Sequence, residues 1–444
     1  MTRHIATVAL CILVLGLIFI GRNLYGPYLA MIRGWGDVAL LLAELSVIGV
    51  LLWCRCWRRG GIGGKVLVVL WCLTPLAMAS AVTIFHVRKY AVLHAQGSRA
   101  QELGRHFIVG YTSFDQVAPL AAKGLIGGIY VTRHNVDGRT VEAVRSEISD
   151  LQAMRSKAGL PPLIVATDQE GGIVSHMSPP LESLPALATL ATLPQAERSK
   201  RAEEFGRTHG RGLASLGITL NFAPVVDLLR SSAPNPLDFN SLISRRAISG
   251  DPQMVADIAQ GYVRGLESFG VEATVKHFPG LGRVRADTHH FQANLDTPVA
   301  ELEASDWLPF RQVLTHSNAY LMVGHVAITA IDPTTAASHS KRVINDLIRN
   351  QWGYQGVITT DDLVMGPIYE HGVCTAVVEA LNAGVDLLLV AYDGLQFYRM
   401  YDCALNASVE GRLDDAMLVK SLARLDARTP AATQAASVMT YSGH

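Results

Sequence analysis

The sequence predicts an α/β protein, a (β/α)₈ barrel of the TIM type, preceded by an all-α membrane anchor of about three transmembrane helices. Two observations carry this prediction. Short apolar, strand-like runs alternate eight times with longer helical patterns over about the length of one such barrel. Ahead of them, residues 1–88 are nearly devoid of acidic residues and rich in Leu, Val and Ile.

Three apolar runs of the N-terminal segment have about the length of membrane spans: Ile5–Gly21, Val38–Cys54 and Val66–Phe85. A cleaved signal peptide would explain the first run alone. No small-residue cleavage site follows that run, and two further runs come next. We therefore expect residues 1–88 to form a transmembrane helical anchor.

The second apolar run contains one carboxylic acid, Glu44. In a small anchor bundle we expect this side chain to face the other helices rather than to mark a function. The polar stretch that follows the third run, residues 89–106, is expected to be a linker.

The barrel is expected over residues 107–428, and the Ala-, Thr- and Ser-rich residues 429–444 are expected to be a disordered tail. The predicted strands are Phe107–Tyr111, Gly127–Val131, Leu163–Thr167, Thr219–Val226, Glu272–Phe278, Ala319–Val326, Gly356–Thr360 and Val385–Tyr392. The predicted helices between them include Thr140–Lys157, Gln195–Leu216, Gln253–Phe269, Val299–Thr315 and Thr375–Ala383.

Most of these strand runs are apolar without alternation, which fits a parallel sheet buried on both faces. A doubly wound open sheet is the structural alternative. No glycine-rich phosphate loop follows the first strand, which weakens that alternative.

Polar side chains recur where the predicted strands end, and the C-terminal strand ends of such barrels carry the functional groups. These residues are Asp168, Asp227, Lys276, His277, His325, Asp361 and Asp393. A run of buried apolar residues that ends repeatedly in a charge predicts a site at the barrel mouth.

Composition excludes some classes of partner. The chain has 38 basic and 38 acidic residues, so no global charge favours binding to nucleic acid. Four of its six cysteines lie in or beside the apolar segment, and no metal-ligand spacing occurs. We expect no disulfide between the remaining two, Cys374 and Cys403.

Five strings, in register, resemble the single-domain β-N-acetylhexosaminidases of glycoside hydrolase family 3. The resemblance covers residues 107–424. The strings are ATDQEGG (Ala166–Gly172), NFAPVVDL (Asn221–Leu228), KHFPGLG (Lys276–Gly282), ADTHH (Ala286–His290) and GVITTDDLVMG (Gly356–Gly366).

The resemblance implies that Asp361 is the catalytic nucleophile, and that His289, oriented by Asp287, is the acid/base residue. A carboxylate at the barrel mouth can attack an anomeric carbon and form a glycosyl-enzyme intermediate. An imidazole titrates near neutral pH and can protonate a leaving oxygen and later deprotonate water. Asp362, adjacent to the nucleophile, is expected to cap a helix instead.

The resemblance also implies sugar-binding roles for Asp168, Arg246, Lys276 and His277, with Asp227 and His325 supporting the site. Asp168 would accept hydrogen bonds from sugar hydroxyls, and Lys276 and Arg246 would donate them. The chain departs from the family pattern at three positions, where it has Ile173 and His176 in place of arginines and Leu281 in place of a histidine. His176 would then substitute for an arginine that contacts the sugar.

These expectations describe a retaining glycosidase that removes terminal β-N-acetylglucosamine from a carbohydrate substrate, with no metal or organic cofactor. A phosphorylase or a β-glucosidase of the same family is an alternative, and a membrane-tethered sugar-binding sensor is the non-enzymatic one. The basic loop between the second and third apolar runs favours the cytoplasmic side for that loop. Mainly because the resemblance implies a cell-wall substrate, such as peptidoglycan fragments, we expect a multi-pass protein of the cytoplasmic membrane with its barrel on the outer side.

Overall fold

A computed structural model describes residues 2–59, 61–230 and 241–428 and divides the chain into two compact units. The first unit comprises residues 1–95 together with Leu395–Asp402, and the second comprises Gln96–Gly394 and the segment from Cys403 onward. The predicted tail, residues 429–444, lies outside the described residues.

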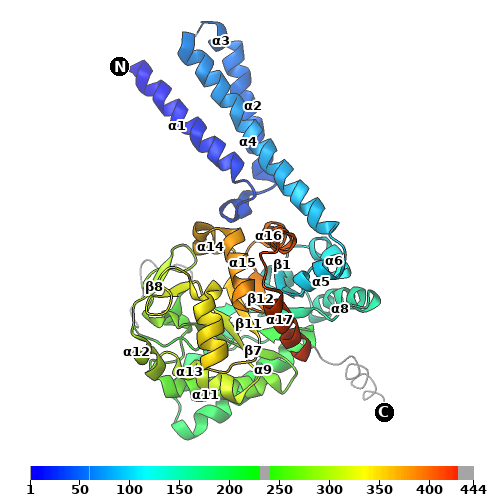
Figure 1. The fold of residues 1–444 in the computed structure, drawn as a ribbon, viewed down its shortest axis with the longest axis vertical. Helices are drawn as coiled ribbons and strands as arrows, with labels where there is room; N and C mark the ends of the chain where they lie inside the picture. Colours follow the sequence, from blue (N-terminus) through cyan, green and yellow to red (C-terminus); the bar gives the residue numbers. More distant parts are fainter. Residues whose placement is uncertain (1, 60, 231–240, 429–444) are drawn as a thin grey trace. The chain divides into compact units, whose positions relative to one another are not determined.

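The first unit is built of helices (Figure 1). They are α1 (Thr2–Arg22), η1 (Pro27–Ile32), α2 (Trp35–Trp53), α3 (Cys56–Arg59) and α4 (Gly61–Leu93). Helices α1 and α4 approach closely at Gly21, where a Cβ atom would meet the Met78 side chain at 3.0 Å. Glu44 of α2 is buried, as expected, with an exposed fraction of 1%.

Two helices of this unit, α2 and α4, are long and apolar enough to cross a membrane. The predicted first span lies in α1, but the part of α1 whose side chains are described, Ala9–Arg22, is shorter than a bilayer requires. The described residues therefore contain two candidate spans, and a three-span anchor is not confirmed.

The predicted linker, residues 89–106, is largely helical. Helix α4 continues to Leu93, and a short helix, α5 (Ser98–Gly104), belongs to the second unit. The prediction rested on the polar composition of this stretch. Leu103 of α5 is nevertheless buried, because a short helix can be polar overall and still pack one face against the protein.

In the described part of the second unit, eight parallel strands close into a barrel in the order β1-β12-β11-β9-β7-β6-β3-β2. The strands are β1 (Phe107–Gly110), β2 (Gly128–Tyr130), β3 (Ile164–Thr167), β6 (Leu220–Asn221), β7 (Glu272–Phe278), β9 (Tyr320–Val323), β11 (Ile358–Asp362) and β12 (Leu387–Val390). All eight predicted strands are in this barrel, and the predicted fold class is confirmed for this unit.

Helices surround the barrel (Figure 1). They are α6 (Phe114–Lys123), α7 (Arg133–Val136), α8 (Val141–Lys157), η2 (Leu187–Thr192), α9 (Gln195–Leu216), α10 (Ile243–Arg246), α11 (Pro252–Glu267), α12 (Val299–Ala304), α13 (Leu308–His316), η4 (Ala337–His339), η5 (Arg342–Gln351), α14 (Gly366–His371), α15 (Val373–Ala383) and α17 (Asp415–Arg428), with a single turn at η3 (Leu281–Arg283). The turn η6 (Gly394–Gln396) and the helix α16 (Phe397–Val409) are divided between the two units, because Leu395–Asp402 belongs to the first. Glycines let α9 and α11 pack closely, because a Cβ atom at Gly206 or Gly265 would overlap the backbone of the other helix.

Large side chains from several strands fill the barrel interior. They include Ile108, Tyr130, Leu220, Phe222, Tyr320, Met322, Leu387 and Leu389, all of them buried. The barrel is therefore a packed core, and its polar groups gather at the rim where the strands end.

Two small strand pairs extend this rim. The hairpin β4 (Gln169–Gly171) and β5 (Val174–Ser175) follows β3 directly, and its turn needs Gly171 and Gly172 because both have positive φ, 92° and 65°. The strand β8 (Ala293–Leu295) pairs in parallel with β10 (Val326–Ile328). This second pair ties the long loop after β7 to the loop after β9.

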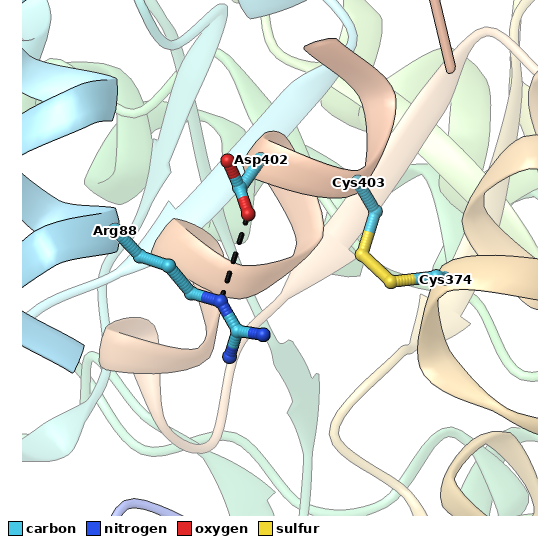
Figure 2. Close-up of a disulfide and its surroundings, with 4 residues drawn as sticks. All are labelled: Arg88, Cys374, Asp402 and Cys403. Atoms are coloured by element: carbon cyan, nitrogen blue, oxygen red, sulfur yellow. Dashed lines mark ion pairs between the residues drawn. A yellow bond between two sulfur atoms is a disulfide. The ribbon is translucent and has the colours of Figure 1, made fainter. Parts of the chain in front are cut away.

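A disulfide joins Cys374 of α15 to Cys403 of α16 (Figure 2). The expectation of no bridge was therefore wrong. The two residues are separated by 29 positions in the sequence, but helix packing brings their Cα atoms to 5.2 Å, within the range that a disulfide spans.

Candidate active site

The end of β11 presents two adjacent carboxylates with different partners. Asp362 accepts backbone hydrogen bonds from Val364 (3.0 Å), Ala391 (2.9 Å) and Tyr392 (2.8 Å). It thus ties the turn after β11 to the residues that follow β12, and it caps no helix, since α14 begins only at Gly366. Burial raises the pKa of Asp362 to about 6.

Asp361, by contrast, accepts a hydrogen bond from the neighbouring Asp362 N–H at 2.8 Å. Burial raises its pKa, but the facing imidazoles of His277, His325 and His289 lower it by more, so the pKa lies below its usual value. Asp361 is therefore ionised at neutral pH, the state that a nucleophilic carboxylate requires.

The predicted pair Asp287 and His289 is formed on the loop after β7. One carboxylate oxygen of Asp287 lies 3.0 Å from His289 Nδ1 and also accepts the His289 backbone N–H at 3.0 Å. Ser241 donates its hydroxyl to the same oxygen at 3.3 Å. Asp287 is fully buried, whereas 38% of the His289 side chain is exposed. A proton on Nδ1 shared with the carboxylate leaves Nε2 as the reactive nitrogen.

A backbone contact holds this loop against the turn after β11. The Gly366 N–H donates to the His289 carbonyl at 2.8 Å. A Cβ atom at position 366 would overlap the His290 carbonyl oxygen, so only glycine permits this approach. The contact joins the loop that carries the imidazole of His289 to the turn that follows the carboxylate of Asp361.

A second cluster forms where β3 ends. Asp168 accepts hydrogen bonds from the Tyr130 hydroxyl at 2.5 Å and from Lys276, which also pairs with Glu170 at 2.7 Å. Arg246 binds the two oxygens of Glu170 at 2.6 and 3.0 Å. Its carboxylate partner is therefore Glu170, and its role as a donor to the sugar remains a prediction.

Glu170, Tyr130 and Ser241 had no role in the sequence-based account. Glu170 lies in the same string as Asp168, and the sequence offered a signal for it. Two predicted site cations, Lys276 and Arg246, need more than one carboxylate if both are buried. Nothing in the sequence pointed to Ser241, because its contact with Asp287 joins segments 46 positions apart.

The charges on Glu170 predict how stability depends on pH. Burial raises its pKa, but Arg246 and Lys276 lower it by more, to about 2 against an ordinary 4.5. Because the folded value is depressed, this carboxylate stabilises the fold above about pH 4.5, and the contribution is lost as the pH falls toward 2. Replacing it removes the carboxylate that pairs with the buried Arg246 and one of the two carboxylates that pair with the buried Lys276.

We therefore expect Glu170→Gln to lower the free energy of unfolding at neutral pH by roughly 3–5 kcal/mol. Urea unfolding of the full chain followed by tryptophan fluorescence measures this loss. The control is Glu204→Gln, which removes an exposed pair with Arg201 and should cost about 1 kcal/mol or less. Equal losses in the two variants would contradict the assignment of a buried ionic cluster.

His277 is oriented by a contact with Asp227. Its Nδ1 lies 2.8 Å from an Asp227 oxygen, and its backbone N–H points to the same carboxylate. Asp227 also accepts the Leu281 N–H at 2.6 Å. His325 contacts the Asp362 carbonyl through Nε2 at 2.9 Å. Asp227 and His325 are both buried, and each contacts backbone groups as well as a neighbouring side chain.

Comparison with known proteins adds the family. Residues 101–427 match the model of the glycosyl hydrolase family 3 N-terminal domain. The chain belongs to glycoside hydrolase family 3. It is therefore a glycosidase.

Relatives within the family include a protein named beta-hexosaminidase from Stenotrophomonas maltophilia, 37% identical over 288 residues that cover 64% of this chain and 81% of that one. A solved family 3 β-N-acetylglucosaminidase from Paenibacillus sp. is 31% identical with a TM-score of 0.68, covering 75% of this chain and 62% of that chain. A β-N-acetylhexosaminidase from Beutenbergia cavernae is 27% identical with a TM-score of 0.66, covering 76% and 99%.

The three departures from the family 3 pattern lie in different surroundings. His176 is near Asp168, and its Nδ1 accepts the Arg133 N–H at 3.3 Å. Ile173 is exposed at the tip of the β4–β5 hairpin, with 43% of its surface accessible. Leu281 is buried, and its backbone N–H, rather than its side chain, serves the site. Of the three, His176 is the one placed beside a predicted sugar-binding residue.

Proposed function

We propose that the chain is a retaining β-N-acetylhexosaminidase that removes terminal β-linked N-acetylglucosamine through a covalent glycosyl–Asp361 intermediate. The observation that carries the proposal is the Asp287–His289 pair, held at 3.0 Å on a loop whose His289 carbonyl accepts the Gly366 N–H of the turn that follows Asp361. The relatives named beta-hexosaminidase support the choice of an N-acetylated amino sugar.

In the first step Asp361 attacks the anomeric carbon while protonated His289 donates its proton to the departing oxygen. The C–O bond to the leaving group breaks as the new ester bond forms. The Asp287 carboxylate stabilises the imidazolium before the transfer and holds the ring in place.

In the second step neutral His289 accepts a proton from water, and the resulting nucleophile attacks the same carbon. The ester bond to Asp361 breaks, and Asp361 returns as a carboxylate. Two displacements at one carbon give retention of configuration.

Asp168, which follows β3, and Lys276 and His277 of β7 are proposed to bind sugar hydroxyls. Lys276 has three N–H donors, of which two are engaged by Asp168 and Glu170. Arg246 is proposed to hold Glu170 and so fix the position of Lys276. His176 is proposed to contact the sugar from beside Asp168.

Specificity is tested with nitrophenyl glycosides, with and without inorganic phosphate. We expect the N-acetylglucosaminide to be cleaved far faster than the glucoside, with a rate that does not depend on phosphate. Comparable rates on both sugars would contradict the proposed substrate. A large acceleration by phosphate, with a sugar phosphate as the product, would make the enzyme a phosphorylase.

We also propose that α2 and α4 anchor the chain in the cytoplasmic membrane with the barrel outside, where cell-wall amino sugars such as muropeptides are the natural substrate. The short connection between α2 and α4 carries Arg55, Arg58 and Arg59, which favours the cytoplasmic side for it. The segment after α4 then lies on the outer side. The Cys374–Cys403 disulfide agrees with this, because disulfides persist in oxidising compartments.

This orientation is tested by thiol labelling of wall-stripped cells that express Val419→Cys, a position on α17 with 66% of its surface exposed. A membrane-impermeant maleimide should label position 419 in sealed cells. The native Cys54, an exposed thiol in the connection after α2, is the internal control and should react only after permeabilisation. The reverse pattern would place the barrel inside.

A further inference from the structure

Three side chains that the reaction does not use converge beside the barrel. They are His339 at the end of η4, His371 at the end of α14 and Glu379 on α15. One ligand atom from each lies within 4.8 Å of the other two. The two imidazole ring centroids are 4.6 Å apart, and His371 Nε2 lies 2.7 Å from a Glu379 oxygen.

His339 contributes a buried nitrogen with no partner among the described residues. Its side chain belongs to a residue with an exposed fraction of only 4%, and its Nε2 makes no hydrogen bond there. A buried polar atom without a hydrogen-bond partner lowers the stability of the fold by about 1–3 kcal/mol. A ligand bound to this nitrogen would remove that cost.

A chain of hydrogen bonds fixes which form this nitrogen takes. The Asp362 carbonyl can only accept, so His325 Nε2, 2.9 Å away, carries a proton. Burial favours the neutral form of the ring, so His325 Nδ1 is an acceptor, and Ser338 donates its hydroxyl to it at 2.8 Å.

The Ser338 hydroxyl has one proton, which is used in that bond. The Ser338 oxygen therefore accepts from His339 Nδ1–H at 3.1 Å. In a neutral imidazole with a proton on Nδ1, Nε2 holds a lone pair. The Nε2 lone pair of His339 thus lies next to a second imidazole and a carboxylate. A bound cation would accept this lone pair.

We propose that His339, His371 and Glu379 bind a divalent transition-metal ion such as Zn²⁺. Two imidazole nitrogens and one carboxylate oxygen form a donor set that zinc uses in proteins, with water in the fourth position. Binding replaces the His371–Glu379 hydrogen bond and joins η4, α14 and α15 through one ion. The hydrogen bond from His339 Nδ1 to Ser338 is the outer contact that such ligands normally have.

The proposed site connects to the reaction centre through the same chain. A metal on His339 Nε2 keeps the proton on Nδ1, which keeps Ser338 donating to His325 and His325 donating to the Asp362 carbonyl. The ion therefore stabilises the end of β11, next to Asp361, without touching substrate.

The test is zinc binding to the full chain in detergent, measured by competition with a chromogenic chelator. The wild type should bind zinc tightly, and the loss of one ligand, in His371→Ala or Glu379→Gln, should weaken this binding by at least the ~10–100-fold that loss of an outer contact costs. Both residues are partly exposed, so these variants should fold. The matched control, His316→Ala, removes an exposed histidine at the end of α13 and should bind like the wild type.

Asp287 and His289 form the other pair that zinc could choose, so His289→Ala is measured beside these variants. Zinc binding should persist in His289→Ala. Absence of tight binding in the wild type would overturn the proposal. Binding that survives in His371→Ala and Glu379→Gln but disappears in His289→Ala would overturn it as well, and neither result depends on glycosidase activity.

Discussion

Replacing Asp361 with asparagine should abolish turnover of a nitrophenyl N-acetylglucosaminide, with kcat falling by a factor on the order of 10⁶, the size seen when a catalytic nucleophile is removed. Asparagine keeps the shape of the side chain and can still accept the Asp362 N–H. It lacks the negative charge that forms the ester bond. The variant should therefore fold normally and still bind the sugar.

The control for this variant is Asp150→Asn, which neutralises an exposed carboxylate on α8. It should retain full activity. Thermal unfolding of both variants checks the fold. An Asp361→Asn protein that keeps more than a few per cent of wild-type activity, with no trace of deamidation, would exclude Asp361 as the nucleophile.

Replacing His289 with alanine should have an effect that depends on the leaving group. Removal of a general acid costs roughly 10²–10⁴-fold for a poor leaving group, such as the alcohol of a disaccharide. A nitrophenol needs little protonation, so the first step should stay fast and the second, which needs the base, should become slow. The glycosyl-enzyme should then accumulate and give a burst of nitrophenol.

The measurement is kcat/KM, which reports the first step even when the second limits turnover, on a series of aryl N-acetylglucosaminides of increasing leaving-group pKa. The value of kcat/KM should fall more steeply with leaving-group pKa in His289→Ala than in the wild type. The neighbouring His290→Ala is the matched control and should keep the wild-type slope. Parallel slopes for wild type and His289→Ala would contradict the assignment of His289 as the acid.

The barrel could be predicted because each strand is recognisable from a short stretch of consecutive residues. Most strands are short runs of apolar residues buried on both faces, as at Phe107–Gly110 and Leu387–Val390. Such a run is typical of a strand in a parallel sheet that is covered on both sides. Polar residues placed directly after such runs, such as Asp168 and Asp361, could be assigned to the rim from the same pattern.

Contacts between distant segments could not be predicted in this way. The Cys374–Cys403 disulfide depends on how α15 packs against α16, and the spacing of the two cysteines in the sequence does not predict that packing. The same holds for Arg246, whose guanidinium meets Glu170 across 76 positions. The Gly366–His289 contact, which brings the acid/base loop to the nucleophile strand, is also of this kind.

The anchor was predicted less well for a different reason. Hydropathy identifies α2 and α4, but the polar residues after the third apolar run were interpreted as a linker although α4 continues to Leu93. The helix α4 changes from apolar to polar composition without ending. Composition alone therefore placed the boundary too early.

The covalent step is tested most directly by trapping the intermediate. A 5-fluoro N-acetylglucosaminyl fluoride reacts in the first step, because fluoride leaves readily, and the ring fluorine slows the second step by destabilising its positively charged transition state. Digestion of the labelled full chain and mass measurement of its peptides should find the fluorosugar on Asp361. A label on another carboxylate, such as Asp168 or Asp362, or active enzyme that takes no label while releasing product of inverted configuration, would contradict the mechanism.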